Sequence, residues 1–219
     1  MNLAILIDGP SAVIVLGGTA LATLLRSGLG DCRVTLAKLG QLGQRRFDAQ
    51  ATRAELALQV QEIHKDGLLR AQPHHFDDRE FTEVTDALIG ERSVKALLAR
   101  HEAHRARRLA QSERAVRTLA QAGELAPVFG LAGTLVSLSQ MPLDGSMRAG
   151  MAGAIAMAVV TTLYGLVLAN LLFAPLAKIV ERAAQAEEAE RQAVIDWLAA
   201  QLAEAVPPRR AAPAAAQAA

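Results

Sequence analysis

The sequence predicts an all-α integral membrane protein with three transmembrane helices and a helical cytoplasmic part. Three observations predict this fold class. Three stretches of the chain lack charged residues, whereas charges are dense between them. The longest of these stretches exceeds the ~20 residues that an α-helix needs to cross a bilayer. The charged segments show no sustained alternation of apolar and polar residues, which strands would require.

The three uncharged stretches are Pro10–Leu25, Leu125–Leu143 and Ala149–Ala177. A buried helix in a soluble core is the alternative for each, but the third runs for 29 residues, which favours membrane insertion. The first is the shortest, and Asp8 before it predicts a helix cap with a proline in the first turn. It lacks the basic flank of a signal peptide.

The distribution of Lys and Arg predicts the orientation. Seventeen basic residues lie between Arg26 and Glu124 and five follow from Lys178 onward, whereas only Arg148 lies between the second and third stretches. Because positively charged loops stay on the cytoplasmic side, we expect the N-terminus outside. The expected organisation is a transmembrane helix in 1–25, a cytoplasmic helical region in 26–124, transmembrane helices at 125–143 and 149–177, a cytoplasmic helix at 178–206 and a disordered tail at 207–219.

The charged region between the first two spans is expected to be helical. The predicted helices cover 52–63, 81–88 and 93–123, with breaks at Gly67 and Pro73 and an end at Gly90.

Several functional classes find no support in the sequence. The net charge of +1 and only seven aromatic residues argue against nucleic-acid binding. Cys32 is the single cysteine, so an intrachain disulfide and a CxxC site are excluded. His74 and His75 near Asp77 are interpreted as a solvated loop rather than a metal site. No phosphate loop, activated nucleophile or paired carboxylates are recognisable, so we expect no enzyme and no cofactor.

The second and third spans each carry one face of small and hydroxyl-bearing residues. On the second span these are Ala126, Gly130, Gly133, Thr134 and Ser137, and on the third they are Ala158, Thr161, Thr162, Gly165 and Ala169. Such faces are typical of close helix packing, and the glycines are expected to serve it. The sharper interpretation is that the hydroxyls line a polar path. Neither span contains Asp, Glu, Lys, Arg or His, so any titrating carboxylate would have to come from a partner.

Three segments resemble a known family. Residues 126–134 read APVFGLAGT, residues 161–165 read TTLYG and are followed by Asn170 and FAPLA at 173–177, and residues 8–11 read DGPS before VLGGT at 15–19. In their order along the chain and in their spacing, these segments are similar to motifs of the MotA and PomA stator proteins, in the MotA/TolQ/ExbB proton channel family. Members usually have four spans, and the resemblance implies that this chain begins at their second.

The resemblance implies a pentameric ring of this chain around a single-span MotB-like partner that carries a membrane aspartate. It also implies H⁺ or Na⁺ flow that turns the ring against a rotor. Thr134 and Thr162 would face the ion path with Thr161 beside them, and Pro127 and Pro175 would match prolines linked to gating and torque.

The cytoplasmic part departs from the family pattern. His64 and Lys65 match the basic rotor-contact position, but the acidic position reads Gln72-Pro73-His74. Two alternatives stay open: an ExbB or TolQ type energiser of a periplasm-spanning partner, and a membrane scaffold without ion flux.

Overall fold

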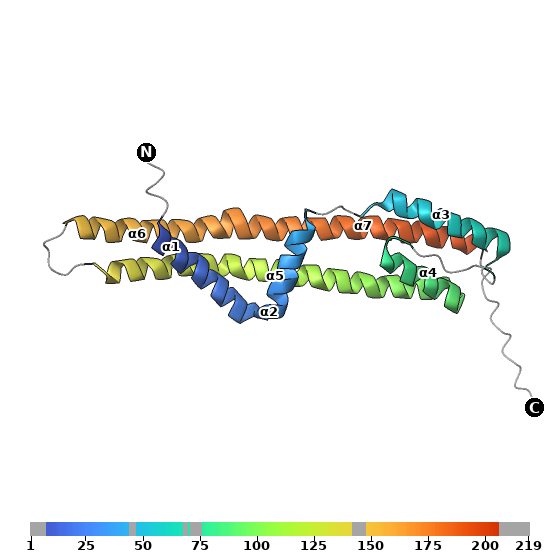
Figure 1. Ribbon diagram of the computed structural model, residues 1–219, viewed down its shortest axis with the longest axis horizontal. Helices are drawn as coiled ribbons and strands as arrows, with labels where there is room; N and C mark the ends of the chain where they lie inside the picture. Colours follow the sequence, from blue (N-terminus) through green and yellow to red (C-terminus); the bar gives the residue numbers. More distant parts are fainter. Residues whose placement is uncertain (1–7, 44–46, 68–69, 71–75, 142–147, 206–219) are drawn as a thin grey trace, which may run out of the picture. The chain divides into compact units, whose positions relative to one another are not determined.

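The computed structural model describes residues 8–43, 47–67, 70, 76–141 and 148–205, and regular structure in this part of the chain is entirely helical. The elements are α1 (Gly9–Ala12), the π-helical turn η2 (Val13–Gly17), α2 (Gly18–Gln41), α3 (Ala49–Asp66), α4 (Arg79–Glu91), α5 (Val94–Ser139), α6 (Arg148–Val167), the π-helical turn η3 (Leu168–Phe173) and α7 (Ala174–Ala205) (Figure 1). Gly9–Gln41, Val94–Ser139 and Gly150–Ala203 are each long and apolar enough to cross a membrane. The predicted fold class is therefore confirmed. The tail expected to be disordered, 207–219, lies outside the described residues.

The chain divides into two compact units, and α5 and α7 each contribute to both. The membrane unit comprises Met1–Arg45 and Arg108–Gln185, and the polar unit comprises Arg46–Arg107 and Ala186–Ala219. The membrane unit extends beyond the uncharged stretches, because the span helices continue past them and stay packed together. The contacts there join Leu39 and Leu42 to a small buried cluster made of Ala115, Leu119, Ala177 and Val180.

The first span starts as its sequence predicts. The Asp8 carboxylate accepts a hydrogen bond from the Ser11 backbone N–H at 3.0 Å, and Pro10 occupies the first turn. Because the proline has no N–H to satisfy, it is well placed there. Helix α2 then bends sharply at Gly28, whose φ of 80° and ψ of 161° are non-helical (Figure 1).

The polar unit has a conventional hydrophobic core. Its buried residues come from α3, α4, α5 and α7 and comprise Leu56, Val60, Ile63, Phe81, Val84, Leu88, Leu97, Val194, Ile195, Leu198 and Leu202. Helix α3 is capped by Asp48 and ends before Gly67, whose φ is 77°. Helix α4 runs past the expected end at Gly90, because Arg92 takes the left-handed conformation that terminates it.

Two prolines lie inside long helical segments. Pro127 lies within α5 without ending it, and Pro175 is the second residue of α7, just after the π-helical turn η3. A proline removes a backbone hydrogen bond and its ring crowds the carbonyl four residues earlier. The wider turn before Pro175 gives that carbonyl room, so the last span continues into α7.

Candidate ion-path groove

Helices α5 and α6 approach each other very closely at three glycines. A Cβ atom on Gly165 would lie 2.6 Å from the Ala126 carbonyl oxygen, and one on Gly130 would lie 3.0 Å from the Thr161 carbonyl oxygen. A Cβ on Gly133 would lie 2.8 Å from the Thr161 methyl carbon. The two faces of small residues therefore meet each other within one subunit, as close-packed membrane helices do.

The same contact buries polar groups. Thr161 is fully buried and Ser137 is 1% exposed. Their hydroxyls donate to carbonyl oxygens of their own helices, Thr161 to Ala158 at 2.9 Å and Ser137 to Gly133 at 2.8 Å. These satisfied hydroxyls can lie in an apolar contact without an unpaired donor.

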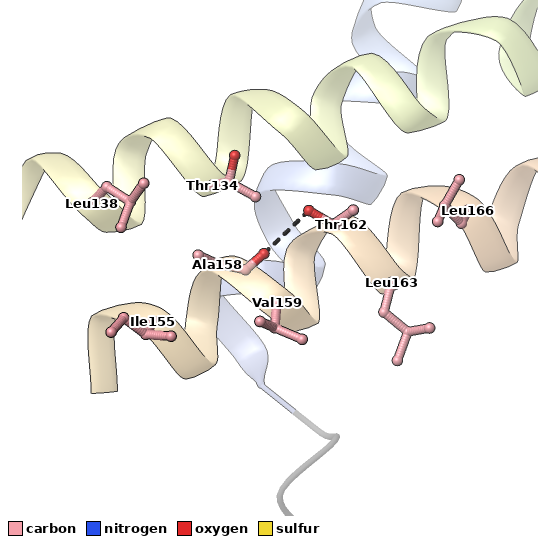
Figure 2. Close-up of a pocket in the computed structure, with 8 residues that line it drawn as sticks. All are labelled: Thr134, Leu138, Ile155, Ala158, Val159, Thr162, Leu163 and Leu166. Atoms are coloured by element: carbon pink, nitrogen blue, oxygen red, sulfur yellow. Dashed lines mark hydrogen bonds between the residues drawn. The ribbon is translucent and has the colours of Figure 1, made fainter. Parts of the chain in front are cut away.

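An open groove of about 440 Å³ lies beside this contact. Thr134 and Leu138 line it from α5, and Ile155, Ala158, Val159, Thr162, Leu163 and Leu166 line it from α6 (Figure 2). The groove is thus mostly aliphatic, with one hydroxyl from each helix. Its leucine, isoleucine and valine walls stay between 38% and 63% exposed, so they offer apolar surface outside the subunit's own core.

The two groove hydroxyls are oriented by their own helices. Thr134 donates to the Leu131 carbonyl at 2.6 Å, and Thr162 donates to the Ala158 carbonyl at 3.2 Å, the bond drawn in Figure 2. A hydroxyl whose hydrogen is engaged in this way still has oxygen lone pairs to offer. Both threonines therefore present hydrogen-bond acceptors, or ligands for a cation, to whatever occupies the groove.

The structure separates the three threonines that the resemblance groups. Thr134 and Thr162 line the groove, whereas Thr161 lies against Gly133 in the buried contact. Asn170, on the same helix, is exposed and donates to the Leu166 carbonyl at 2.9 Å.

The two expected gating prolines lie in different environments. Pro127 is half-buried, and its Cα would lie 3.0 Å from a Cβ on Gly165, so it is part of the close α5–α6 contact. Pro175 is exposed on α7.

The expected rotor-contact residues lie at the end of α3 in the polar unit. A ring nitrogen of His64 lies 3.0 Å from the Gln201 carbonyl oxygen, so this histidine helps to fasten α3 to α7. Lys65 is exposed. No group of residues that could hold a metal ion is found in the described ranges, which do not include His74 and His75.

The sequence analysis did not identify the aliphatic walls of the groove. Ile155, Val159, Leu163 and Leu166 recur at intervals of four, four and three residues, which places them along one side of a helix. That spacing is the sequence feature that could have predicted an apolar wall on this side of α6. Tyr164 was also missed as a contact residue: its hydroxyl accepts a hydrogen bond from the Asp8 backbone N–H at 3.2 Å and ties α6 to the start of the first span.

Comparison with known proteins adds three findings. The model of the MotA/TolQ/ExbB proton channel family matches residues 72–193, more than half of the chain. Motility protein A of Cereibacter sphaeroides is 29% identical over 88% of this chain and 76% of its own length. Chemotaxis protein PomA of Vibrio alginolyticus is 25% identical over 91% and 79%.

A solved structure shares the fold. The structure of C. jejuni MotAB matches with a TM-score of 0.82, covering 95% of this chain and 83% of the matched chain at 19% identity. At that identity the likeness speaks for the arrangement of the helices alone.

Proposed function

The chain belongs to the MotA/TolQ/ExbB proton channel family, and we propose that it is the ring-forming channel subunit of a MotA-like stator. It is a multi-pass protein of the bacterial inner membrane, and its family is one of ion channels rather than enzymes. In the proposed role it couples the flow of H⁺, or of Na⁺, to mechanical work on a flagellar rotor. The relatives named for motility and chemotaxis support this branch of the family.

The groove between α5 and α6 carries the proposal. A single apolar helix from a partner would cover its aliphatic walls, and a carboxyl group on that helix would meet the Thr134 and Thr162 oxygens. The second and third uncharged stretches contain no Asp, Glu, Lys, Arg or His, so the titrating carboxylate has to come from the partner. The partner that fits is a single-span protein with one carboxylate at the depth of the groove.

The protonation state of that carboxyl group would decide whether the groove holds it. A protonated carboxyl has a hydrogen to donate to the Thr162 oxygen, whose own hydrogen is engaged with Ala158. An ionised carboxylate has no hydrogen to donate, and an unpaired charge among aliphatic side chains is strongly unfavourable. Loss of the proton would therefore favour movement of the partner helix out of this groove toward the next one, which is the step that turns a ring.

The proposed assembly is a pentamer of this chain around two copies of the partner, with the N-terminus outside. The cytoplasmic position of the polar unit follows from the basic residues that flank the spans. Within the polar unit we propose Lys65 as the rotor-contact cation, because it is exposed at the end of α3. His64 is the second proposed rotor-contact residue, although one of its ring nitrogens already contacts the Gln201 carbonyl oxygen.

Ion flux into proteoliposomes tests the proposal. The chain is reconstituted with the single-span protein that co-purifies with it, and the Thr162→Val variant is compared with the parent. The substitution removes the hydroxyl and keeps the shape, so we expect flux to fall at least about tenfold, as loss of about 1.4 kcal/mol would produce, while the ring stays intact in detergent. The chain without its partner should not conduct.

Thr23→Val is the matched control, because Thr23 is 7% exposed on the first span and does not line the groove. It should conduct like the parent. Flux from the isolated chain, or undiminished flux in Thr162→Val, would refute the groove as the ion path. A co-purifying partner with a peptidoglycan-binding domain supports the stator, whereas one with a periplasmic energy-transducing arm supports an ExbB or TolQ type energiser.

A further inference from the structure

The bend at Gly28 divides the first long helix into a span and a short helical segment, residues 29–41 (Figure 1). The bend comes three residues after Leu25, the last residue of the uncharged stretch. Gly28 has a φ of 80°, a conformation that side-chain-bearing residues rarely adopt, so a glycine is needed for the change of direction. The chain therefore turns where the apolar part of the span ends.

One side of the 29–41 segment is fastened to the membrane unit. Thr35 is 5% exposed, and Leu39 packs against the buried cluster that contains Leu119 and Val180. Because these contacts hold the segment in place, its remaining surface faces a defined direction.

Another side of the segment exposes large apolar residues around a cation. Leu29 is 64% exposed and Leu36 is 69% exposed, and their spacing of seven residues places them on one face. Arg33, also exposed, lies four residues after the first and three before the second, on the same side. Leu25, before the bend, is 77% exposed. Exposed leucines of this size on a fastened helix indicate a surface that something else covers.

We propose that the face formed by Leu29, Arg33 and Leu36 binds the surface of a bilayer that contains anionic phospholipid. Leu29 and Leu36 enter the boundary between headgroups and acyl chains, and the Arg33 guanidinium contacts a lipid phosphate. Two observations favour lipid over protein as the occupant. The segment continues directly from a membrane span, and residues 26–41 carry three basic residues against one acidic residue.

This placement does not depend on ion flux, because it requires only that the first span lies in a membrane. The proposed orientation adds that the lipid belongs to the cytoplasmic leaflet. A failure of the stator proposal would therefore leave the lipid contact standing, and the two can be tested separately.

Spin-label accessibility of the full chain, in the assembly in which it is purified, tests the lipid contact. Cys32 is the only cysteine, so Cys32→Ser provides a background into which Leu36→Cys is introduced. In nanodiscs of phosphatidylcholine and phosphatidylglycerol, we expect a label at position 36 to be accessible to oxygen. It should be several-fold less accessible to a water-soluble nickel chelate than a label at the control position.

Leu58→Cys is the matched control, since Leu58 is 63% exposed on α3 of the polar unit and is not part of a predicted span. Adding Arg33→Gln should raise nickel access at position 36 in discs with phosphatidylglycerol and change little in discs of phosphatidylcholine alone.

Two outcomes would overturn the proposal. One is nickel access at position 36 equal to that at position 58. The other is protection from both reagents together with dipolar coupling between labels, which would show that a second copy of the chain covers this face.

Discussion

The two units of this protein are built partly from the same two helices, yet their contacts are of opposite kinds. In the membrane unit, α5 meets α6 through glycines and small side chains, so closely that the Thr161 methyl leaves no room for a Cβ on Gly133 and the Ala126 carbonyl leaves none for a Cβ on Gly165. In the polar unit, the ends of α5 and α7 bury large side chains such as Leu97, Ile195 and Leu198. The difference reflects the surroundings of each contact. Lipid gives no hydrophobic driving force between helices, so close backbone approach replaces it, whereas water rewards the burial of large aliphatic groups.

The ion pairs of the two units also differ, in how far they are exposed to solvent. In the polar unit, the side chain of Arg191 is 11% exposed, lies 2.7 Å from Asp78 and hydrogen-bonds Glu187 at 2.9 Å. In the membrane unit, the pair between Arg26 and Glu124 is 3.6 Å long and both side chains are more than half exposed. Among the described residues, ion pairs shielded from solvent therefore lie beside the core of the polar unit and not in the membrane unit.

The largest expected effect is on the close contact of the membrane unit. Gly165→Leu places a side chain where even a Cβ would lie 2.6 Å from the Ala126 carbonyl oxygen, and backbone atoms cannot move aside cheaply. We expect the α5–α6 contact to be destabilised by about 3 kcal/mol or more. The native complex should then be lost on size-exclusion chromatography in detergent.

Gly153→Leu on the same helix is the control, because nothing lies within 4 Å of its Cβ position. A native-size complex from Gly165→Leu, or equal loss in both variants, would show that close approach is not what holds α5 to α6.

A smaller effect is expected in the core of the polar unit. Leu198→Ala should lower the stability of this unit by about 2–5 kcal/mol, because it leaves a cavity among residues that are fully buried. Hydrogen exchange of α3 and α4 amides measures the change. Leu58→Ala should shift the same exchange by less than about 0.5 kcal/mol, since Leu58 is largely exposed. Equal shifts would contradict the assignment of the core.

The sequence was sufficient for the spans, but not for the side of the helix on which each threonine lies. Charge-free runs identify membrane helices without any tertiary information. Thr161 and Thr162 are neighbours, however, and adjacent helical residues point about 100° apart. Only the packing of Gly133 on Thr161 decides which one is buried and which lines the groove.

Other features of the fold depend on contacts that no local pattern reveals. Gly28 and Gly30 are both glycines in one helical run, yet only Gly28 has a positive φ. Packing of the following segment through Leu39 and Leu42 accompanies that difference. In the same way, α4 continues past Gly90 to Glu91, because Arg92 and not Gly90 takes the left-handed conformation that ends the helix.

The smallest expected effect compares the two ion pairs through the same conservative substitution. The Arg191 guanidinium lies 4.3 Å from the centre of the Phe47 ring while it pairs with Asp78 and Glu187. Burial alone would lower the pKa of Arg191, but the charges of Asp78 and Glu187 outweigh it and raise the pKa, so this residue stays protonated. Arg191→Lys keeps the charge and removes the planar fork and the ring stacking, which should cost about 1–2 kcal/mol.

Arg26→Lys is the matched change in the membrane unit, and we expect it to cost no more than about 0.5 kcal/mol, because solvent screens an exposed pair and lysine can replace a single long contact. Exchange of α4 amides reports on the first variant, and the thermal stability of the detergent complex reports on the second. If Arg26→Lys weakened its unit as much as Arg191→Lys weakens the polar unit, charge would contribute equally to both. That result would contradict our inference that ion pairs stabilise the polar unit more than they stabilise the membrane unit.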